Sequence, residues 1–193
     1  MHKFLERSEK YYFHYPFPVT IVGAIHDGRS NFMAAAWHMQ LSFDPPLYAV
    51  SISPKRYTNE IIRESGAFSL NFLQFDDYKL AGLVGRTSGR QCYKEEVFDI
   101  KYDAGVKLNV PVLKSAICCY ECKVVDRRAY GDHVLYVGEI LGIHYDSDYY
   151  KDGISPDMLL YAGNDMYTHA EGALAIFGKT EVEDFLKSKK DTK

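Results

Sequence analysis

The residues best suited to chemistry lie between Ser51 and Thr58, where hydroxyls and cations meet at an expected change from strand to helix. A helix start presents free backbone N–H groups and the positive end of the helix dipole, which together favour an anion. Arg56 adds a guanidinium fork, and the hydroxyls of Ser53 and Thr58 add neutral donors. The segment could therefore hold a phosphate monoester. The alternative is a solvated loop in which Thr58 only caps the helix, and the carboxylate of Glu60 favours it because it could satisfy the same donors.

The segment that precedes this helix start offers room for a flat ligand. Residues 31–37 read Asn-Phe-Met-Ala-Ala-Ala-Trp, and the alanines leave space beside the backbone. In a strand, alternate side chains share a face. One face would then carry Asn31, Met33, Ala35 and Trp37, and the other would carry Phe32, Ala34, Ala36 and His38.

A glycine-rich passage at residues 82–90 could also contact a ligand. It lacks the spacing and the lysine of a P-loop, and it does not lie between a strand and a helix as a dinucleotide-binding motif requires. A plain loop is therefore the alternative. His133 follows Gly131 and Asp132 at an expected strand start, where a single histidine is ordinarily a partly buried surface residue.

The cysteines and histidines predict neither a metal site nor a redox pair. Cys119 and Cys122 lie three apart in an expected strand, so their sulfurs would point to opposite faces. Cys118 and Cys122 would share a face but lie too far apart for a bridge, and reduced thiols are expected. The histidines lack paired ligand spacing, and the sequence contains no G-x-S-x-G motif. We assign no catalytic residue and no metal ligand.

The elements that must position these residues are mainly short strands. We expect strands at residues 17–26, 31–37, 47–53, 67–73, 116–128 and 133–145, with a hairpin turn at Asp27 and Gly28. A loop is expected to end at Asp44, Pro45 and Pro46, before the strand at residues 47–53. Helices are expected at residues 58–65, stopped by Gly66, at 75–84 and at about 179–189. This order predicts a mostly β barrel with helical excursions, and it argues against a doubly wound parallel sheet.

Composition sets the broad class. The chain has 193 residues, 47% of them hydrophobic, and we expect one domain over residues 1–193 with a core at about 13–167. The formal net charge of −3 gives no basic excess, so nucleic acid is not an expected partner. The charged N-terminus does not resemble a signal peptide, and no run of about 18 apolar residues occurs. We expect a cytoplasmic protein that does not enter a membrane.

Six short motifs follow one another along the chain: Asn31-x-Met33-x-x-x-Trp37, Asp44-Pro45-Pro46, Ser51-x-Ser53-x-x-Arg56-x-Thr58, Gly66-x-Phe68-x-x-Asn71, Ser88-Gly89-Arg90-x-x-x-Lys94 and Gly131-Asp132-His133-x-x-x-x-Gly138. In this order they resemble the flavin reductase-like family, and within it the flavoredoxin type. No single motif is specific, but six in the right order are hard to obtain by chance. The similarity covers about residues 13–167.

The resemblance implies an FMN-binding split β-barrel with a few peripheral helices, and a homodimer with FMN near the subunit interface. The flavin ring would lie against residues 31–37, and the phosphate on Ser53, Arg56 and Thr58. Many relatives carry a hydroxyl where this chain has Ala34 or Ala36, so backbone N–H groups would have to serve the ring instead. The implied cofactor-binding residues are Asn31, Met33, Ala34, Ala35, Ala36, Trp37, Ser51, Ile52, Ser53, Arg56, Tyr57, Thr58, Asn71, Arg86, Ser88 and Lys94, with His133 as a substrate-binding residue.

The expected function is an FMN-dependent oxidoreductase with NADH or NADPH as transient donor. The acceptor, which the sequence does not name, could be free flavin, a ferric chelate or a redox protein. Hydride transfer to a flavin needs positioning more than acid–base catalysis. An electron-transfer protein without its own NAD(P)H oxidation is a second hypothesis. A β-barrel that binds another ligand is a third.

Overall fold

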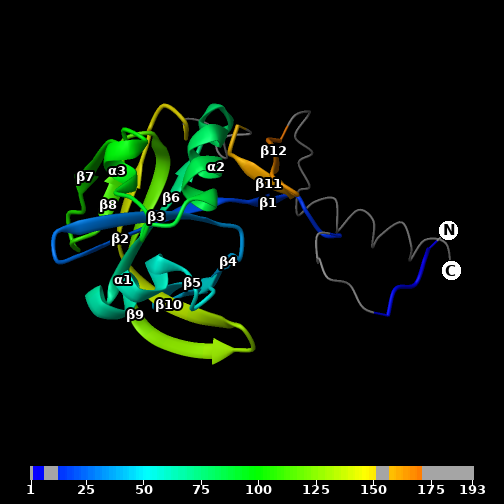
Figure 1. Ribbon diagram of the computed structural model, residues 1–193, viewed down its shortest axis with the longest axis horizontal. Coiled ribbons are helices and arrows are strands. Elements are labelled where there is room, and N and C mark those ends of the chain that lie inside the picture. The colour runs from blue at the N-terminus through cyan, green and yellow to red at the C-terminus, as the bar shows by residue number, and fades with distance from the viewer. Residues whose placement is uncertain (1, 7–12, 151–156, 171–193) are drawn as a thin grey trace, which may run out of the picture.

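The computed structural model describes residues 2–6, 13–150 and 157–170, and its main element is a seven-stranded sheet (Figure 1). The strand order is β3-β2-β6-β9-β10-β5-β4, and every neighbouring pair is antiparallel. The strands are β2 Thr20–His26, β3 Arg29–Ala35, β4 His38–Phe43, β5 Pro46–Ile52, β6 Ala67–Leu73, β9 Ala116–Tyr130 and β10 His133–Tyr145. The prediction of a mostly β fold is confirmed.

The two outer strands of this sheet are neighbours in the chain. Only Ala36 and Trp37 separate β3 from β4, although these strands lie at opposite ends of the strand order. The sheet must therefore curl until its two edges approach each other. The backbone N–H of Ser51 in β5 donates to the carbonyl of Trp37 at 2.8 Å, which fixes this junction. The result is a barrel that stays open along one seam.

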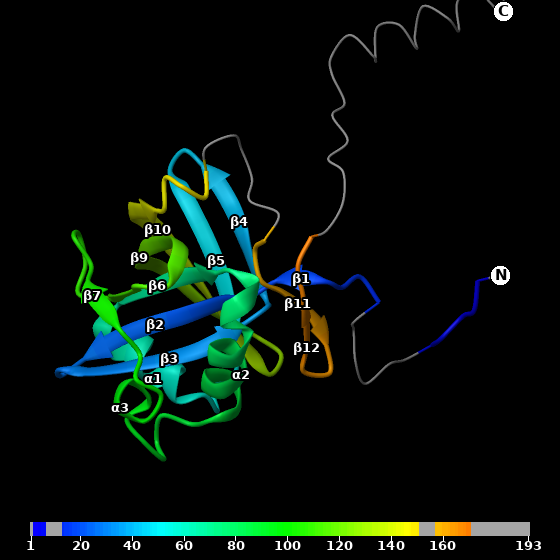
Figure 2. The same ribbon diagram turned by 90° about the horizontal axis from the view of Figure 1, so that it is seen from above.

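Smaller elements surround the barrel. A three-stranded sheet contains β1 Phe17–Pro18, β11 Leu160–Gly163 and β12 Met166–Thr168, and β7 Tyr102–Ala104 pairs with β8 Pro111–Leu113. The helices are α1 Tyr57–Ser65, η1 Phe75–Asp77, α2 Tyr78–Arg86 and α3 Lys94–Val97. Figure 2 shows the three-stranded sheet at one side of the barrel, next to α2. No helix in the described part of the chain has the length and apolar character of a membrane span.

The hairpin turn between β2 and β3 is confirmed. Asp27 and Gly28 both have left-handed backbone angles, with φ of 48° and 72°. A two-residue turn of this kind matches the twist of the strands that it joins. The register pairs His26 with Arg29 and Ala24 with Asn31, so the turn also fixes which residues of β3 face the core.

The core has two apolar clusters, and β3 contributes to both. Ala35 lies in the first cluster with Met33 packed against it, whereas Phe32 lies in the second with Ala34 beside it. The predicted alternation of faces is therefore confirmed as far as Ala35, where the strand ends.

The first helix confirms one prediction and corrects another. Gly66 ends α1 in the left-handed conformation, with φ of 69°, and its N–H bonds to the carbonyl of Ile62. The residue at the N-cap is Arg56, which has extended backbone angles and makes no side-chain capping bond. The prediction that Thr58 caps this helix is wrong, because Thr58 is the second helical residue and its hydroxyl bonds to Asn31 instead.

Other boundaries differ from expectation where tertiary pairing decides them. Residues 38–43 form strand β4, because they pair with β5 in a register that matches His38 with Val50. Gly85 and Arg86 belong to α2, not to the glycine-rich loop, and the short helix α3 was not expected. The predicted helix at about residues 179–189 lies outside the described residues.

Candidate functional site

A groove runs between β3, the start of α1 and the end of α2. It consists of two adjoining cavities of about 330 Å³ each, which share Ala34, Arg56, Gly85 and Arg86 among their lining residues. Each cavity is within the size range of ligand pockets, about 300–1,000 Å³. One cavity, which we call the cationic end, lies at Lys94, and the other, the small-residue end, lies at Ala36.

The cationic end gathers polar groups from four segments of the chain. They come from β3, the start of α1, the loop after α2 and the start of α3. Besides the four shared residues, its lining is Asn31, Met33, Lys55, Tyr57, Thr58, Val84, Thr87, Ser88, Gly89, Gln91 and Lys94.

Lys94 is the least expected member of this lining. Its side chain is only 3% exposed, and its ammonium donates to the carbonyl oxygens of Phe32 and Val84 at 2.7 Å each. Burial lowers the pKa of Lys94 to about 8, against a smaller opposing effect of Cys92, and nearby Arg56 lowers it further. No carboxylate within the described ranges pairs with this ammonium. An anion entering the cationic end would therefore meet a buried positive charge that lacks a counter-ion.

The loop after α2, residues 87–93, lines the cationic end and is held by contacts between arginine side chains and tyrosine rings. The guanidinium of Arg29 lies between the rings of Tyr57 and Tyr93, at 4.7 and 4.5 Å from their centroids, and it also donates to the carbonyl of Gly89. Arg90 lies 5.4 Å from the Tyr57 ring. Such contacts are stronger where the cation is partly desolvated. This stack fixes the loop against the start of α1.

Two further contacts position the same loop. Arg90 pairs with Glu60 and donates to the carbonyl of Lys55 at 3.0 Å, so the Glu60 carboxylate has a partner in the loop. Gly89 lies so close to Asn31 that a Cβ at that position would be 2.0 Å from the amide oxygen. Glycine is required there because the backbone passes directly over Asn31.

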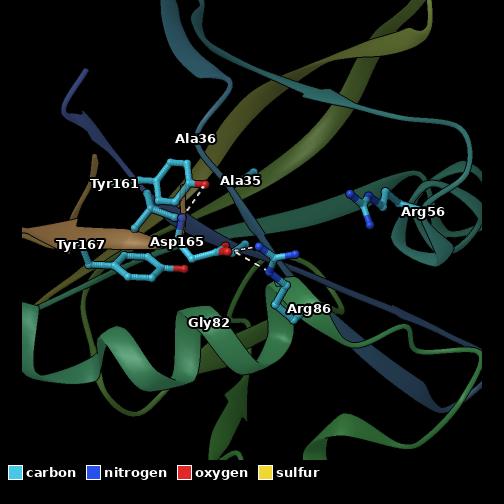
Figure 3. Close-up of a pocket in the computed structure, with 11 residues that line it drawn as sticks. Ala35, Ala36, Arg56, Gly82, Arg86, Tyr161, Asp165 and Tyr167 are labelled. Atoms are coloured by element: carbon cyan, nitrogen blue, oxygen red, sulfur yellow. Dashed lines mark hydrogen bonds and ion pairs between the residues drawn. The ribbon is translucent and has the colours of Figure 1, made fainter. Parts of the chain in front are cut away.

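The small-residue end has a floor of small residues and a wall with two tyrosines (Figure 3). The floor consists of Ala34, Ala35 and Ala36 with the two glycines Gly82 and Gly85 of α2. A Cβ on Gly85 would lie 3.3 Å from the Ala34 side chain, so the glycine lets helix and strand approach closely.

The wall of the small-residue end comes from β11, β12 and the turn between them. Tyr161 and Tyr167 lie beside each other, and Asp165 accepts from Nε of Arg86 at 3.0 Å and from a second guanidinium nitrogen. In Figure 3 this ion pair lies between the two tyrosines and Arg56. Charged groups thus flank a space whose floor is nearly free of side chains.

Most of the predicted cofactor-binding residues meet in this groove. Those that line it are Asn31, Met33, Ala34, Ala35, Ala36, Arg56, Tyr57, Thr58, Arg86, Ser88 and Lys94. The other predicted residues lie elsewhere. Ile52 is in the core at 1% exposure, Ser53 does not line either cavity, and Asn71 is fully buried.

Asn71 has a structural position at the centre of the sheet. Its amide nitrogen donates to the carbonyl of Ile21 at 3.1 Å, and its oxygen accepts from the N–H of Leu113 at 2.9 Å. These bonds connect β6 with β2 and β8, so the polar contacts of the Asn71 side chain lie inside the barrel.

Trp37, Ser51 and His133 lie at a different cavity or beside it. Trp37 and Ser51 line a mainly apolar cavity of about 340 Å³, together with Tyr15 and other residues. The indole N–H of Trp37 donates to the hydroxyl of Tyr15 at 3.1 Å, and its ring lies 4.7 Å from that of His133. His133 also contacts Asp132, with 2.8 Å between Nδ1 and the carboxylate. The structure therefore does not bring these three residues to the groove.

Sequence reasoning missed the wall of the small-residue end. Tyr161, Asp165 and Tyr167 come from the far end of the chain, and no motif connects them with residues 31–37. One signal was present in the sequence, because Asn and Asp tolerate left-handed backbone angles and therefore suit a two-residue hairpin turn. Asn164 and Asp165 form such a turn between the strands that carry Tyr161 and Tyr167. Gly82 lies in the expected helix, but Gly85 was expected in the loop, although its spacing of three from Gly82 suits one face of the same helix.

The described residues show where the cysteines lie and whether possible metal ligands gather. Within these ranges, no group of three or more histidine, cysteine or acidic residues could hold a metal ion. All four cysteines are free, as expected, and Cys118, Cys119 and Cys122 are buried. Burial raises the pKa of each of these three thiols. They are packing residues of the core.

Comparison with known proteins gives the family. Residues 12–170 match the family model described as "Flavin reductase like domain". A ferric-chelate reductase (NAD(P)H) of Archaeoglobus fulgidus is 32% identical over 144 residues, which are 74% of this chain and 79% of that protein. A protein of Aeropyrum pernix is 37% identical over 136 residues, 70% of this chain, and the chain spans about half, 52%, of that relative's length.

Solved structures agree in fold. An FMN-binding protein from Thermus thermophilus with bound p-hydroxybenzaldehyde has a TM-score of 0.82 at 31% identity, covering 91% of this chain and 99% of that one. A flavoredoxin from Methanosarcina acetivorans has a TM-score of 0.83 at 27% identity, covering 94% and 99%. These likenesses confirm the predicted FMN-binding split-barrel fold and the resemblance to flavoredoxins. The chain belongs to the flavin reductase-like family.

Proposed function

We propose that this protein binds FMN in the groove and uses it to pass electrons from NADH or NADPH to a small acceptor. One observation carries the proposal. The buried ammonium of Lys94, near Arg56 and without a carboxylate partner among the described residues, lies in the same groove as a floor of three alanines and two glycines. A ligand with an anionic tail and a flat ring fits both ends at once.

The residues of the cationic end would hold the phosphate. Arg56 can donate two parallel hydrogen bonds, and Lys94 supplies a charge that is only weakly screened because it is buried. The Thr58 and Ser88 hydroxyls add neutral donors. Because hydrogen bonds hold Thr58 to Asn31 and Lys94 to the carbonyls of Phe32 and Val84 before a ligand arrives, these two side chains need little further ordering when the phosphate binds.

The residues of the small-residue end would hold the ring. Ala34, Ala35 and Ala36 place no bulky side chain over the floor, and Arg86 lies at its edge. When bound, FMN supplies a ring that accepts a hydride and releases electrons. The chain's own part is to orient that ring and to present it to a donor, so no residue of the groove needs to act as an acid or a base.

The relatives support a reductase. The Archaeoglobus fulgidus relative is a ferric-chelate reductase that uses NAD(P)H, which supports both the donor and a small acceptor here. A flavin-binding electron carrier without its own NAD(P)H oxidation is the second candidate, and the likeness to a flavoredoxin favours it.

An absorbance spectrum of the purified protein tests the proposal. FMN bound as isolated, or taken up on incubation, should give a yellow protein, whereas a protein that stays colourless after incubation with FMN would contradict flavin binding. NADH or NADPH should then bleach the flavin band under anaerobic conditions. Bound flavin that keeps its colour at millimolar donor would leave only the electron carrier.

We also propose that the protein forms a homodimer through the edge strand β4. Trp37, Met39, Leu41 and Phe43, in or next to this strand, expose between 44% and 87% of their surface. An edge strand rich in exposed apolar side chains is unfavourable in a monomer, and a second copy would cover it. Size-exclusion chromatography with light scattering should give twice the chain mass, and Phe43→Glu should give a monomer. A wild-type monomer at micromolar concentration would contradict the dimer.

A further inference from the structure

A further cavity adjoins the groove on its outer side. It has a volume of about 490 Å³, and half of its lining is shared with the small-residue end. The shared residues are Gly82, Arg86, Asp165 and Tyr167, the residues of its own are Tyr78, Lys79 and Leu83, and Thr87 also lines the cationic end. The ion pair of Arg86 and Asp165 therefore lies on the boundary between the groove and this outer cavity.

The turn between β11 and β12 places Asp165 at this boundary. Asn164 and Asp165 are its two central residues, with left-handed φ values of 51° and 61°. The backbone N–H of Asp165 donates to the hydroxyl of Tyr161 at 3.3 Å, and its carboxylate takes both donor positions of the Arg86 fork. The hairpin thus fixes a carboxylate on the guanidinium.

The carboxylate of Asp165 can nevertheless be displaced from Arg86 at little cost. The side chains of Arg86 and Asp165 are 70% and 55% exposed. Exposed ion pairs contribute little to stability, because water solvates both partners well when they separate. A ligand that brings its own carboxylate could replace Asp165 at Arg86 without leaving a buried charge unpaired.

The remaining lining of the outer cavity suits an aromatic body. Tyr78 and Tyr167, with ring centroids 6.3 Å apart, and Leu83 provide apolar surface. Arg86 and Lys79 provide positive charge, and Asp165 is the only acidic residue among the described residues that line this cavity. Once Asp165 is displaced, the cavity carries two cations.

We propose that the outer cavity binds a planar aromatic anion, whose acidic group replaces the carboxylate of Asp165 on Arg86. This makes the cavity the site of the second reactant, next to the floor of the groove. The role as a reactant site rests on the proposed function, whereas binding of the anion does not.

A pair of matched probes tests the binding. 2-Naphthoate carries the carboxylate, and 2-naphthamide has nearly the same shape without the charge. Isothermal titration of the full chain, with and without FMN, should show naphthoate binding about tenfold more tightly than naphthamide. Asp165→Asn should strengthen naphthoate binding several-fold, because it removes the competing carboxylate. Arg86→Met should abolish the preference for naphthoate over naphthamide.

Two more variants control for position. Asp103 in β7 forms a similarly exposed ion pair with Lys114, and Asp103→Asn, which breaks this pair, should leave naphthoate binding unchanged. Leu83→Asp places a negative charge in the outer cavity outside the groove lining, and it should weaken naphthoate binding at least tenfold while FMN binding stays the same.

Three results would overturn the inference: equal affinity of the wild type for both probes, no gain in Asp165→Asn, or displacement of naphthoate by FMN. A protein that binds naphthoate as described but takes up no FMN would overturn the proposed function and leave this site standing. The two proposals therefore fail separately.

Discussion

The side-chain amide of Asn31 donates a hydrogen bond of 2.7 Å to the hydroxyl oxygen of Thr58, and both residues are buried at the cationic end of the groove. The bond joins the middle of β3 to the first turn of α1. Since the Thr58 oxygen acts as the acceptor, its own O–H can still donate to a ligand. A residue that the sequence places at a helix cap is therefore a donor aimed by a neighbouring strand.

Replacing Thr58 by valine keeps the shape of the side chain and removes the hydroxyl. We expect FMN binding to weaken by ~1 kcal/mol, the usual contribution of a neutral hydrogen bond. The free energy of unfolding should also fall by ~1–2 kcal/mol, because the buried Asn31 amide loses its acceptor. Flavin fluorescence titration and urea unfolding measure the two effects. Thr58→Ser is the control and should retain the wild-type FMN affinity and free energy of unfolding. Full FMN affinity in Thr58→Val would show that the hydroxyl does not reach the ligand.

Removing the guanidinium of Arg56 should weaken binding of the FMN phosphate and should leave binding of the flavin ring unchanged. For Arg56→Ala we expect FMN binding to weaken by ~1–3 kcal/mol, the range for a charge-assisted contact. Riboflavin has the same ring without the phosphate, so its affinity should change little. Arg63→Ala is a matched control in α1, the helix that Arg56 precedes, since Arg63 is exposed and pairs with Glu64. An equal loss for FMN and riboflavin would place the phosphate elsewhere.

The charge of Lys94 predicts how FMN affinity depends on pH. Its pKa of about 8 in the ligand-free protein means that the ammonium is mostly charged at pH 7 and half deprotonated at about pH 8. FMN affinity should therefore begin to fall between pH 7 and 8 and should decrease further as pH rises to 9.5. Lys94→Met should weaken binding at pH 7 and flatten this decline. A decline of the same size in Lys94→Met would assign the titration to another group.

The strands β2, β3, β5, β6, β9 and β10 could be predicted from local sequence, and the contacts at the site could not. Asp27 and Gly28 specify their turn through backbone angles alone, and Gly66 specifies the end of α1 in the same way. β4 was not predicted although Met39, Leu41 and Phe43 alternate with polar residues as in a strand with one buried face, and in the structure these three apolar side chains are exposed. Its pairing with β5 decides its structure.

At the site, too, some residues could be predicted from local sequence and others depend on tertiary contacts. Arg56 and Thr58 were found because a helix start attracts anions for local reasons. The position of Lys94 depends on two carbonyls, of Phe32 and Val84, that lie 62 and 10 residues away in sequence. Asn71 was expected in the site from the family resemblance, and the structure places it inside the sheet, because β6 is buried along its whole length. Such outcomes follow from tertiary packing, which a single sequence does not display.

A buried carboxylate outside the groove should dominate the acid stability of the barrel. Glu121 is fully buried in β9 and accepts from the N–H groups of Val106, Lys107 and Leu108 at 2.7 to 2.9 Å and from Nε2 of His144 at 2.6 Å. Burial alone would raise the pKa of Glu121, but these hydrogen bonds outweigh it and lower the pKa.

We expect Glu121→Gln to lower the free energy of unfolding by ~3 kcal/mol at pH 7, because an amide NH₂ cannot accept these bonds. The folded-state pKa lies below the unfolded value, so the stabilisation is present above the unfolded pKa and is lost as pH falls through the folded one. Urea unfolding at pH 7 and in acid should show the gap between wild type and variant closing at low pH. A gap that stays constant with pH would contradict the assignment.

The stack around Arg29 should control the loop over the cationic end. Arg29→Leu removes the cation between Tyr57 and Tyr93 together with the donor to Gly89. We expect hydrogen exchange of the backbone N–H groups at residues 87–91 to become faster and FMN binding to weaken by ~1 kcal/mol, the scale of such contacts. Arg29→Lys keeps the charge and should therefore retain part of the slow exchange at residues 87–91 and part of the FMN affinity.

Arg128 offers a matched control for this stack, because its guanidinium lies 5.7 Å from the ring of Tyr130 in the β9–β10 hairpin and does not line the groove. Arg128→Leu should leave both the exchange at residues 87–91 and FMN binding unchanged. The loop would not depend on Arg29 if Arg29→Leu gave wild-type exchange there. If exchange became faster while FMN affinity stayed constant, the loop would be free to move without contributing to the phosphate site, and the donors of α1, β3 and Lys94 would account for binding on their own.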